Sequence, residues 1–287
     1  MVLPEFEYLA PDNLKDACAL AKEHGEHGKV MAGGTDVIVA MKEKHIAPAY
    51  IIDIKNIGGL DYIDYDPREG LRIGALTKLR TIEKSQLVQE KFKAISDAAH
   101  YVASTQVRAK GTMVGNIVNA SPSADTVPAL IALRASLKVS GVEGDRVISM
   151  DEFYTGFKKT ALQPGEIVTD ILIPAKKENE HSAYCKHAVR KAMDLAIVGV
   201  AANLTVEGRV VKDARIVLGA VAVTAIRSPK AEAELIGNAL TEEVIAKASV
   251  AAMEDCRPID DVRASAEYRK DMVRVFTKRA IQKAMED

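Results

Sequence analysis

The sequence has 287 residues, 48 % of them hydrophobic and 28 % charged, which is enough to bury the core of one large or two medium-sized domains. The formal net charge of −1 gives no basic footprint for DNA or RNA. The N-terminus has no basic start followed by a long apolar run, and the longest apolar stretch, residues 192–204, is interrupted by Asp194, Gly199 and Asn203. We therefore expect a cytoplasmic protein without a signal peptide or a membrane span.

Hydrophobic periodicity predicts the elements of the first part of the chain. They begin with a helix over residues 13–23 capped by Asp12, a strand over 29–32, a helix over 37–43 and a strand over 49–54. Strands follow at 60–65 and 71–73, helices at 77–85 and 88–102, a small-residue loop at 111–119, a helix at 127–133 capped by residues 121–125, and strands at 136–140 and 167–173.

The texture of the sequence changes after a polar segment, residues 174–181, which starts with a proline and is typical of a linker. We expect strands at 183–189, 196–206 and 214–223, a hairpin turn at 207–209, and helices at 230–236, 242–255 and 266–285. Strands followed by helices predict an α+β C-terminal domain.

The cysteines indicate where redox chemistry can come from. Cys18, Cys185 and Cys256 are far apart, and the chain has no Cys-x-x-Cys spacing. We expect three reduced thiols and neither an iron–sulfur cluster nor a structural zinc ion in this chain. No pair of histidines has metal-ligand spacing, so we expect no metal site. Redox chemistry would need an organic cofactor or a partner chain.

Three segments could bind a ligand, and each has a simpler interpretation. Ala32-Gly33-Gly34-Thr35-Asp36 joins a strand to a helix, where free N–H groups can bind phosphate, although it could be a plain tight turn. The loop at 111–119 could present polar groups or be a buried turn. Lys186 could meet a phosphate or polarise a ring carbonyl, or it could be an exposed strand lysine. We find no nucleophile motif and no convincing pair of carboxylates.

Taken in order, these segments resemble the flavin subunits of the xanthine dehydrogenase and carbon monoxide dehydrogenase family. The resemblance runs nearly from end to end, so its specificity comes from many weak matches together. The matching segments are Ala32-Gly33-Gly34-Thr35-Asp36; Gln106-Val107-Arg108; Gly111-Thr112-Met113-Val114-Gly115-Asn116-Ile117-Val118-Asn119-Ala120-Ser121-Pro122 with Asp125; Gly165-Glu166-Ile167; Ile173-Pro174; Lys186 with Arg190 and Met193-Asp194-Leu195-Ala196; and Arg263-Ala264-Ser265-Ala266-Glu267-Tyr268-Arg269.

The resemblance implies an α+β fold of two domains. The first, residues 1–176, would be an FAD-binding domain of the vanillyl-alcohol-oxidase (PCMH) type with lobes of about 1–57 and 58–176. The second, residues 177–287, would be the smaller C-terminal domain of carbon monoxide dehydrogenase flavoproteins.

The resemblance also implies which residues contact FAD, and it implies no catalytic acid or base. The segment around the glycine turn would wrap the pyrophosphate, a second loop would line the cofactor, and Asp125 would hydrogen-bond its polar linker. The implied contacts are Val30, Met31, Ala32, Gly33, Gly34, Thr35, Asp36, Val37, Val102, Thr112, Val114, Gly115, Asn116, Asp125, Val168 and Lys186. One departure stands out: the family usually has glycine where this chain has Val114, and a β-carbon there requires a negative φ and no cofactor packed against it.

The implied function is distributed over several chains. A large molybdopterin-binding subunit would hydroxylate the substrate at the molybdenum cofactor, a small subunit with two iron–sulfur clusters would relay electrons, and FAD in this chain would pass them to NAD or another acceptor. The residues Met193-Asp194 and the C-terminal sequence favour bacterial xanthine dehydrogenase relatives. The alternatives are a free-standing flavin oxidoreductase and a binding or assembly module without a redox role.

Overall fold

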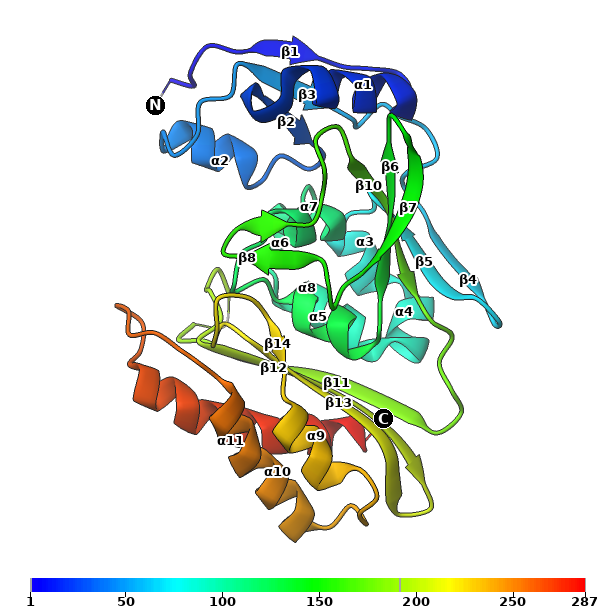
Figure 1. Ribbon diagram of the computed structural model, residues 1–287, viewed down its shortest axis with the longest axis vertical. Helices are drawn as coiled ribbons and strands as arrows, with labels where there is room; N and C mark the ends of the chain where they lie inside the picture. The colour runs from blue at the N-terminus through cyan, green and yellow to red at the C-terminus, as the bar shows by residue number, and fades with distance from the viewer. Residues whose placement is uncertain (1, 191, 287) are drawn as a thin grey trace.

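The computed structural model describes residues 2–190 and 192–286, and Figure 1 shows them as three layers of structure stacked along the long axis. The described residues contain a three-stranded, a five-stranded, a four-stranded and a two-stranded sheet, each accompanied by helices or loops. This mixture of separate sheets and helices confirms the predicted α+β class.

The N-terminal lobe is built around a parallel sheet in the order β1 (Glu7–Leu9), β3 (Tyr50–Asp53) and β2 (Gly28–Met31). The helix α1 (Leu14–His24), the short 3₁₀ turn η1 (Gly25–His27) and α2 (Val37–Lys42) complete the lobe. The prediction that Asp12 caps α1 is wrong. Asn13 has the extended conformation of a cap, and its side chain accepts a hydrogen bond from the Asp16 N–H.

The second lobe contains an antiparallel sheet in the order β4 (Ile63–Asp66), β5 (Gly70–Gly74), β10 (Ile167–Ile173), β6 (Ser136–Gly141) and β7 (Gly144–Ser149). Its helices are α3 (Leu79–Lys84), α4 (Gln86–Lys91), α5 (Lys93–Tyr101), α6 (Thr105–Arg108), α7 (Met113–Val118) and α8 (Thr126–Ala132), and a small hairpin joins β8 (Tyr154–Gly156) to β9 (Lys159–Thr160).

Two predictions for this lobe are wrong. The helix expected at 88–102 is two helices, because Phe92 leaves the helical conformation and buries its ring in the core. The loop expected at 111–119 is largely the helix α7, whose first turn is closed by the hydroxyl of Thr112, which accepts a hydrogen bond from the Gly115 N–H at 2.9 Å. Small residues at these positions gave a loop-like composition, whereas the Thr112 cap and burial of Met113 and Ile117 favour the helix.

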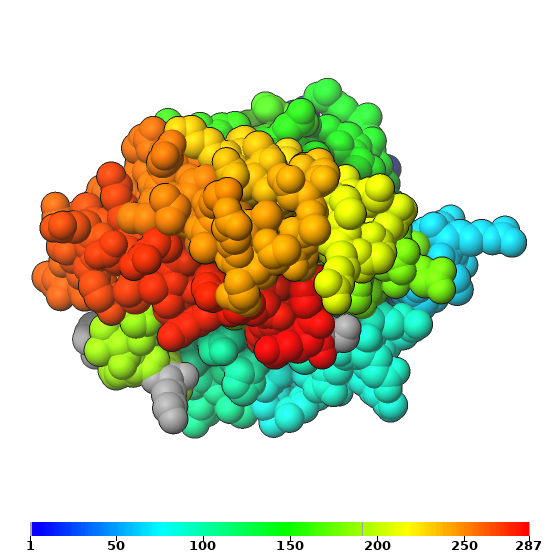
Figure 2. All heavy atoms as spheres, turned by 90° about the horizontal axis from the view of Figure 1, so that it is seen from below, coloured from blue at the N-terminus to red at the C-terminus, as the bar shows by residue number. Residues whose placement is uncertain are grey.

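The C-terminal part has an antiparallel sheet in the order β11 (Glu180–His187), β12 (Val198–Glu207), β13 (Val210–Gly219) and β14 (Ile226–Arg227). The helices α9 (Pro229–Leu235), α10 (Glu242–Asp255) and α11 (Ala266–Ala284) cover one face and form the surface seen from below in Figure 2. The other face packs on α5 and α8, because Tyr184, Ala201 and Val217 belong to the core cluster of the second lobe. The sheet is therefore buried on both faces.

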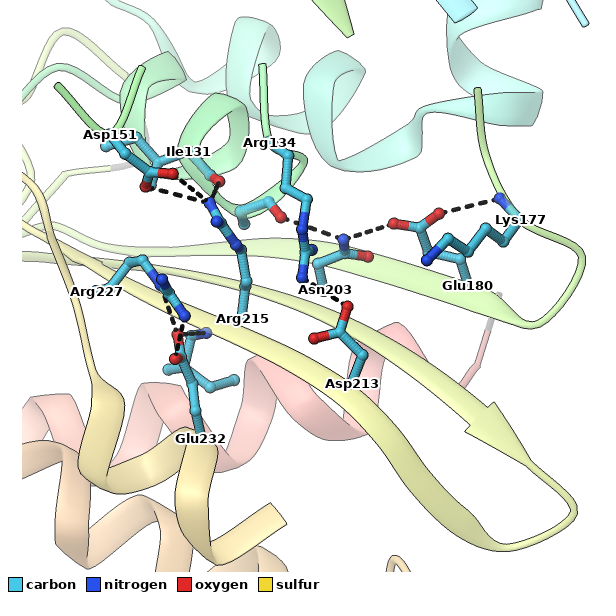
Figure 3. A network of polar contacts seen from close by, with 12 residues as sticks. Ile131, Arg134, Asp151, Lys177, Glu180, Asn203, Asp213, Arg215, Arg227 and Glu232 are labelled. Atoms are coloured by element: carbon cyan, nitrogen blue, oxygen red, sulfur yellow. Dashed lines mark hydrogen bonds and ion pairs between the residues drawn. The ribbon is translucent and has the colours of Figure 1, made fainter. Parts of the chain in front are cut away.

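Polar side chains fasten this sheet to the end of α8 (Figure 3). Asn203 donates to the Ala132 carbonyl at 3.1 Å, and Arg215 donates to the Ile131 carbonyl at 3.0 Å and to both carboxylate oxygens of Asp151. The last carbonyls of a helix lack partners within the helix, and side chains of the C-terminal sheet satisfy two of them here. The two parts of the chain are therefore joined by directed contacts as well as by apolar packing.

Three further properties of the described residues concern membrane spans, metal ligands and cysteines. None of the helices among residues 2–190 and 192–286 has both the length and the apolarity needed to cross a membrane. The same residues contain no cluster of three or more His, Cys, Asp or Glu side chains arranged to hold a metal ion. The three cysteines are unpaired, and Cys18 and Cys256 are buried.

Candidate functional site

The glycine turn after β2 is in direct contact with the segment that leads into α7. Gly34 has a φ of 72°, a conformation that favours glycine. A β-carbon built on Gly33 would lie 2.3 Å from the carbonyl oxygen of Lys110 and 2.7 Å from the α-carbon of Gly111. The glycine at position 33 is thus needed for the approach of the two segments. The Lys110 backbone fills the space beside the Gly33 α-carbon.

The second segment is pinned on its other side as well. A β-carbon on Gly111 would meet the hydroxyl of Thr35 at 3.1 Å, and the carbonyl of Gly111 accepts a hydrogen bond from the Leu79 N–H at 2.9 Å. The backbones of Thr112 and Lys78 also form an isolated antiparallel β-bridge. The turn at residues 32–36 and the start of α7 therefore form one rigid unit.

This unit brings the N-termini of α2 and α7 close to each other. The first N–H groups of a helix have no partner inside it, so two converging helix starts offer several donors to one anionic group. Among the described residues outside its own helix backbone and chain neighbours, a β-carbon on Gly115 would meet the Thr112 hydroxyl at 3.0 Å and no other atom within 4 Å. The flank of α7 at Gly115 is therefore open beside these donors.

The departure at Val114 does not obstruct this flank. Val114 lies in α7, and its side chain is buried in the core cluster of the second lobe. Its neighbour Asn116 is half-buried, and its Oδ1 atom accepts a hydrogen bond from the hydroxyl of Thr126 at 2.7 Å. With that oxygen occupied, the amide nitrogen of Asn116 is left to donate.

A buried ion pair lies at the other end of the candidate site. The ammonium of Lys186 is 2.9 Å from one carboxylate oxygen of Asp125, and the hydroxyl of Tyr184 donates to the other at 2.9 Å. Burial, only partly offset by Lys186 and Tyr184, raises the pKa of Asp125 to about 6. Asp125 stands just before α8 in the second lobe, and Tyr184 and Lys186 lie in β11. These contacts therefore join the second lobe to the C-terminal sheet.

Lys186 has no donor to spare in this arrangement. Its ammonium also donates to the carbonyls of Tyr101 at 3.1 Å and Asp194 at 2.8 Å, and its side chain is only 6 % exposed. The alternative of an exposed strand lysine is therefore wrong, and a direct bond from Lys186 to a ligand would replace one of these contacts. The ring of His187, the next residue of β11, contacts Tyr268 and Phe276 on the side of α11.

Two of the predicted apolar contacts, Val102 and Val168, lie in the core cluster of the second lobe, which also contains Val114. Val102 follows Tyr101 at the end of α5, and its carbonyl accepts a hydrogen bond from Arg108 at 2.9 Å. Val168 is buried in β10, opposite Val139. The structure thus arranges the predicted residues in two groups, one around the glycine turn and α7 and one around Asp125, and the Thr126–Asn116 bond connects them.

Sequence reasoning missed the supporting residues of this site. Thr126, Tyr184, Arg108 and Glu83 are buried polar residues that hold predicted contacts in place. Arg108 lies within the matching segments, but its sequence position carries no sign of the bonds that it makes. Their partners are brought together only by folding, so no spacing pattern could have found them.

Comparisons with known proteins fit this geometry. Residues 4–176 match the family described as FAD binding domain in molybdopterin dehydrogenase, and residues 183–284 match the CO dehydrogenase flavoprotein C-terminal domain. The chain is 34 % identical to the carbon monoxide dehydrogenase medium chain of Hydrogenophaga pseudoflava, over 99 % of this chain and 98 % of the relative. It is 30 % identical to the xanthine dehydrogenase FAD-binding subunit of Escherichia coli O157:H7, over 95 % and 93 %.

A solved structure agrees with the fold. Carbon monoxide dehydrogenase from Hydrogenophaga pseudoflava superposes with a TM-score of 0.96, covering 100 % of this chain and 99 % of the matched chain at 34 % identity. These matches confirm the predicted resemblance, the two-part FAD-binding fold and the FAD-binding role. The chain therefore belongs to the family of FAD-binding subunits of molybdenum-containing oxidoreductases of the carbon monoxide and xanthine dehydrogenase type.

Proposed function

We propose that FAD binds along the unit formed by the glycine turn and the start of α7, with its pyrophosphate at the two helix N-termini. The observation that carries this proposal is the contact of Gly33 with Lys110, which brings both sets of N–H donors to one place. The proposed contacts are Val30, Met31, Ala32, Gly33, Gly34, Thr35, Asp36, Val37, Val102, Thr112, Val114, Gly115, Asn116, Asp125, Val168 and Lys186.

Within this site the side chains have different tasks. The amide of Asn116, oriented by Thr126, donates to the cofactor. Asp125 is held by Tyr184 and Lys186, so its role is to keep the segment before α8 in place and to accept hydrogen bonds from the polar linker of FAD. Lys186 acts by fixing Asp125, Tyr101 and Asp194 relative to one another.

The proposed physiological role is electron transfer inside a complex. FAD, when bound, supplies the chemistry that accepts electrons from iron–sulfur clusters and passes them to NAD or another acceptor. A large molybdopterin-binding subunit and a small subunit with two iron–sulfur clusters would be the partners, in the cytoplasm. This proposal is supported by the similarity to a medium chain and to an FAD-binding subunit, names that imply further chains.

The substrate belongs to another chain of the complex. The assignment to a xanthine dehydrogenase stays a prediction. The identity to the xanthine dehydrogenase subunit, 30 %, is lower than the 34 % identity to the carbon monoxide dehydrogenase medium chain.

The test is to purify the full chain, record its visible absorbance and identify any released cofactor by chromatography. We expect a flavin spectrum and FAD on release, or stoichiometric uptake of added FAD, and no hydroxylase activity from this chain alone. A colourless chain that takes up no FAD would contradict the proposed site. If the native protein purified without partner chains and still reduced an acceptor, the free-standing oxidoreductase would replace the complex.

A further inference from the structure

A cluster of charges with a buried ion pair at its centre lies among α3, α5 and α6, with Arg80 and His100 at its exposed edge. Glu83 and Arg108 have side chains only 6 % and 7 % exposed, and the Arg108 Nε atom donates to a Glu83 carboxylate oxygen at 3.0 Å. Two further side chains contact the same carboxylate: the Arg80 Nη1 atom is 3.1 Å from Oε2, and the His100 Nδ1 atom is 2.9 Å from Oε1. Burial alone would raise the pKa of Glu83, but the hydrogen bonds from His100, Arg108 and Arg80 outweigh it and lower that pKa to about 2.

Arg108 uses its remaining nitrogens on the backbone segment beside the flavin site. One Nη atom donates to the carbonyl of Val102 at 2.9 Å, and the other lies 3.4 Å from the hydroxyl of Thr105. Between them Ala103 has a φ of 44°, a conformation that alanine rarely adopts. The guanidinium therefore holds a strained turn closed at the end of α5.

Arg108 is also the last residue of α6, the helix that leads to the backbone against which Gly33 packs. After Arg108, the N–H groups of Lys110 and Gly111 both donate to the carbonyl of Val107, at 3.0 Å and 2.7 Å. These two residues are the ones against which Gly33 packs. A displacement of Arg108 would thus move both Val102 and the backbone that sets the spacing of the two helix N-termini.

Charge pairing alone does not explain why an arginine stands at this position. Well-packed apolar side chains often replace a buried ion pair without loss of stability. A planar guanidinium, however, fixes the directions of its bonds to a carboxylate, a carbonyl and a hydroxyl, which an apolar residue cannot do and a lysine on its flexible stem does less rigidly.

We propose that Arg108, held by Glu83, is a positioning residue for the flavin site: it fixes the Val102 carbonyl and the Lys110–Gly111 backbone in the geometry that binds FAD. This inference rests on the proposed flavin site. Neither residue is among the proposed FAD contacts, so their effect would be transmitted through the backbone of residues 102–111.

The experiment compares R108M and R108K with the wild-type full chain. FAD dissociation constants are measured by titration of the apoprotein, together with the absorbance spectrum and midpoint potential of bound flavin and the melting temperature of the apoprotein. The matched control is R215M, because Arg215 also joins a carboxylate and a carbonyl while lying at the far end of α8 (Figure 3).

We expect R108M to raise the FAD dissociation constant at least about tenfold, which corresponds to about 1.4 kcal/mol, and to shift the flavin spectrum and potential. R108K should fold, bind FAD with an affinity between those of wild type and R108M, and show a smaller shift. R215M should lower the melting temperature while keeping the wild-type dissociation constant and potential.

Two results would overturn the inference. One is an R108M chain whose FAD affinity and potential equal those of R215M. The other, decisive if R108M does not fold, is an R108K chain with wild-type affinity and potential. A wild-type chain that binds no FAD is a different outcome, because it would remove the proposed site itself.

Discussion

The α-carbon of Gly33 packs against the carbonyl oxygen of Lys110 so closely that an added β-carbon would lie 2.3 Å from that oxygen. The two residues belong to different lobes, and their contact sets the distance between the N-termini of α2 and α7. Glycine at this position therefore determines the shape of the candidate site through the packing of one lobe against the other.

Gly33→Ala should consequently damage the protein before any cofactor is added. The methyl group cannot fit against backbone atoms, so the segments must separate, and we expect the apoprotein to lose about 1–3 kcal/mol of unfolding free energy and FAD binding to weaken. Denaturant titration of the apoprotein and FAD titration measure the two effects. An apoprotein as stable as wild type would show that the contact yields without cost.

Gly115→Ala is the matched comparison, because an added β-carbon would meet no backbone of another segment among the described residues and would approach only the Thr112 hydroxyl, at 3.0 Å. Alanine is a better helix former than glycine by roughly 0.5–1 kcal/mol, so we expect the stability of the apoprotein to stay within about 1 kcal/mol of wild type. FAD affinity should nevertheless fall, since the methyl group fills the space beside α7. Unchanged affinity would place the cofactor away from this flank.

Thr126→Val should remove the hydrogen bond that orients the side-chain amide of Asn116. The side chain of Thr126 is fully buried, and its hydroxyl is the group that occupies the Asn116 oxygen. We expect a loss of about 1 kcal/mol of stability and a several-fold weaker FAD affinity, both measured as above. Thr277→Val is the control, because that buried hydroxyl has no hydrogen-bond partner among the described residues, and its removal should leave both quantities unchanged. Equal behaviour of the two variants would contradict the role of Thr126.

Asp125→Asn should leave the Lys186 ammonium buried without a counter-ion. Removing one member of a buried pair costs about 3 kcal/mol, and we expect a loss of that order in the unfolding free energy at neutral pH. The double variant Asp125→Asn/Lys186→Met removes the stranded charge and should recover most of the loss. A double-mutant cycle by denaturant unfolding measures this coupling, and simple additivity of the two changes would argue against it.

Glu83 should make stability sensitive to acid. Its folded pKa of about 2 is below the value of about 4.3 expected in the unfolded chain, so its contribution is complete above pH 4.3 and is lost as the pH falls toward 2. The shift corresponds to about 3 kcal/mol. Unfolding free energies of wild type and Glu83→Gln, measured from pH 6 to pH 2, should therefore converge in acid. A constant difference across that range would show that the charge of Glu83 is not responsible.

Most regular elements could be predicted from the sequence, because their signals are local. The C-terminal helix α10 matches the predicted residues 242–255, and the strand β10 matches 167–173. The hairpin between β12 and β13 was also predicted, since Gly208 adopts the positive φ of 62° that the turn requires. The resemblance to a known family then gave the domain types that these elements form.

The errors arose where tertiary contacts override local composition. The polar, small-residue sequence at 111–119 is a helix because Thr112 caps it and its apolar side is buried. The break at Phe92 follows from burial of its ring, which no periodicity in one helix signals. In the candidate site, the sequence indicated Gly33 and Lys186 separately, without showing what either residue contacts. Folding places Gly33 against the Lys110 backbone and pairs Lys186 with Asp125.

The sandwiched C-terminal sheet has a consequence for how the chain is made. Synthesis produces α5 and α8 well before β11, β12 and β13, so the apolar face that will receive Tyr184, Ala201 and Val217 has no cover while the rest of the chain is being translated. A product cut between β10 and β11 would keep that face exposed and would tend to aggregate. The strands β11, β12 and β13 therefore complete the core of the second lobe, and expression of the N-terminal portion on its own needs a substitute for that sheet.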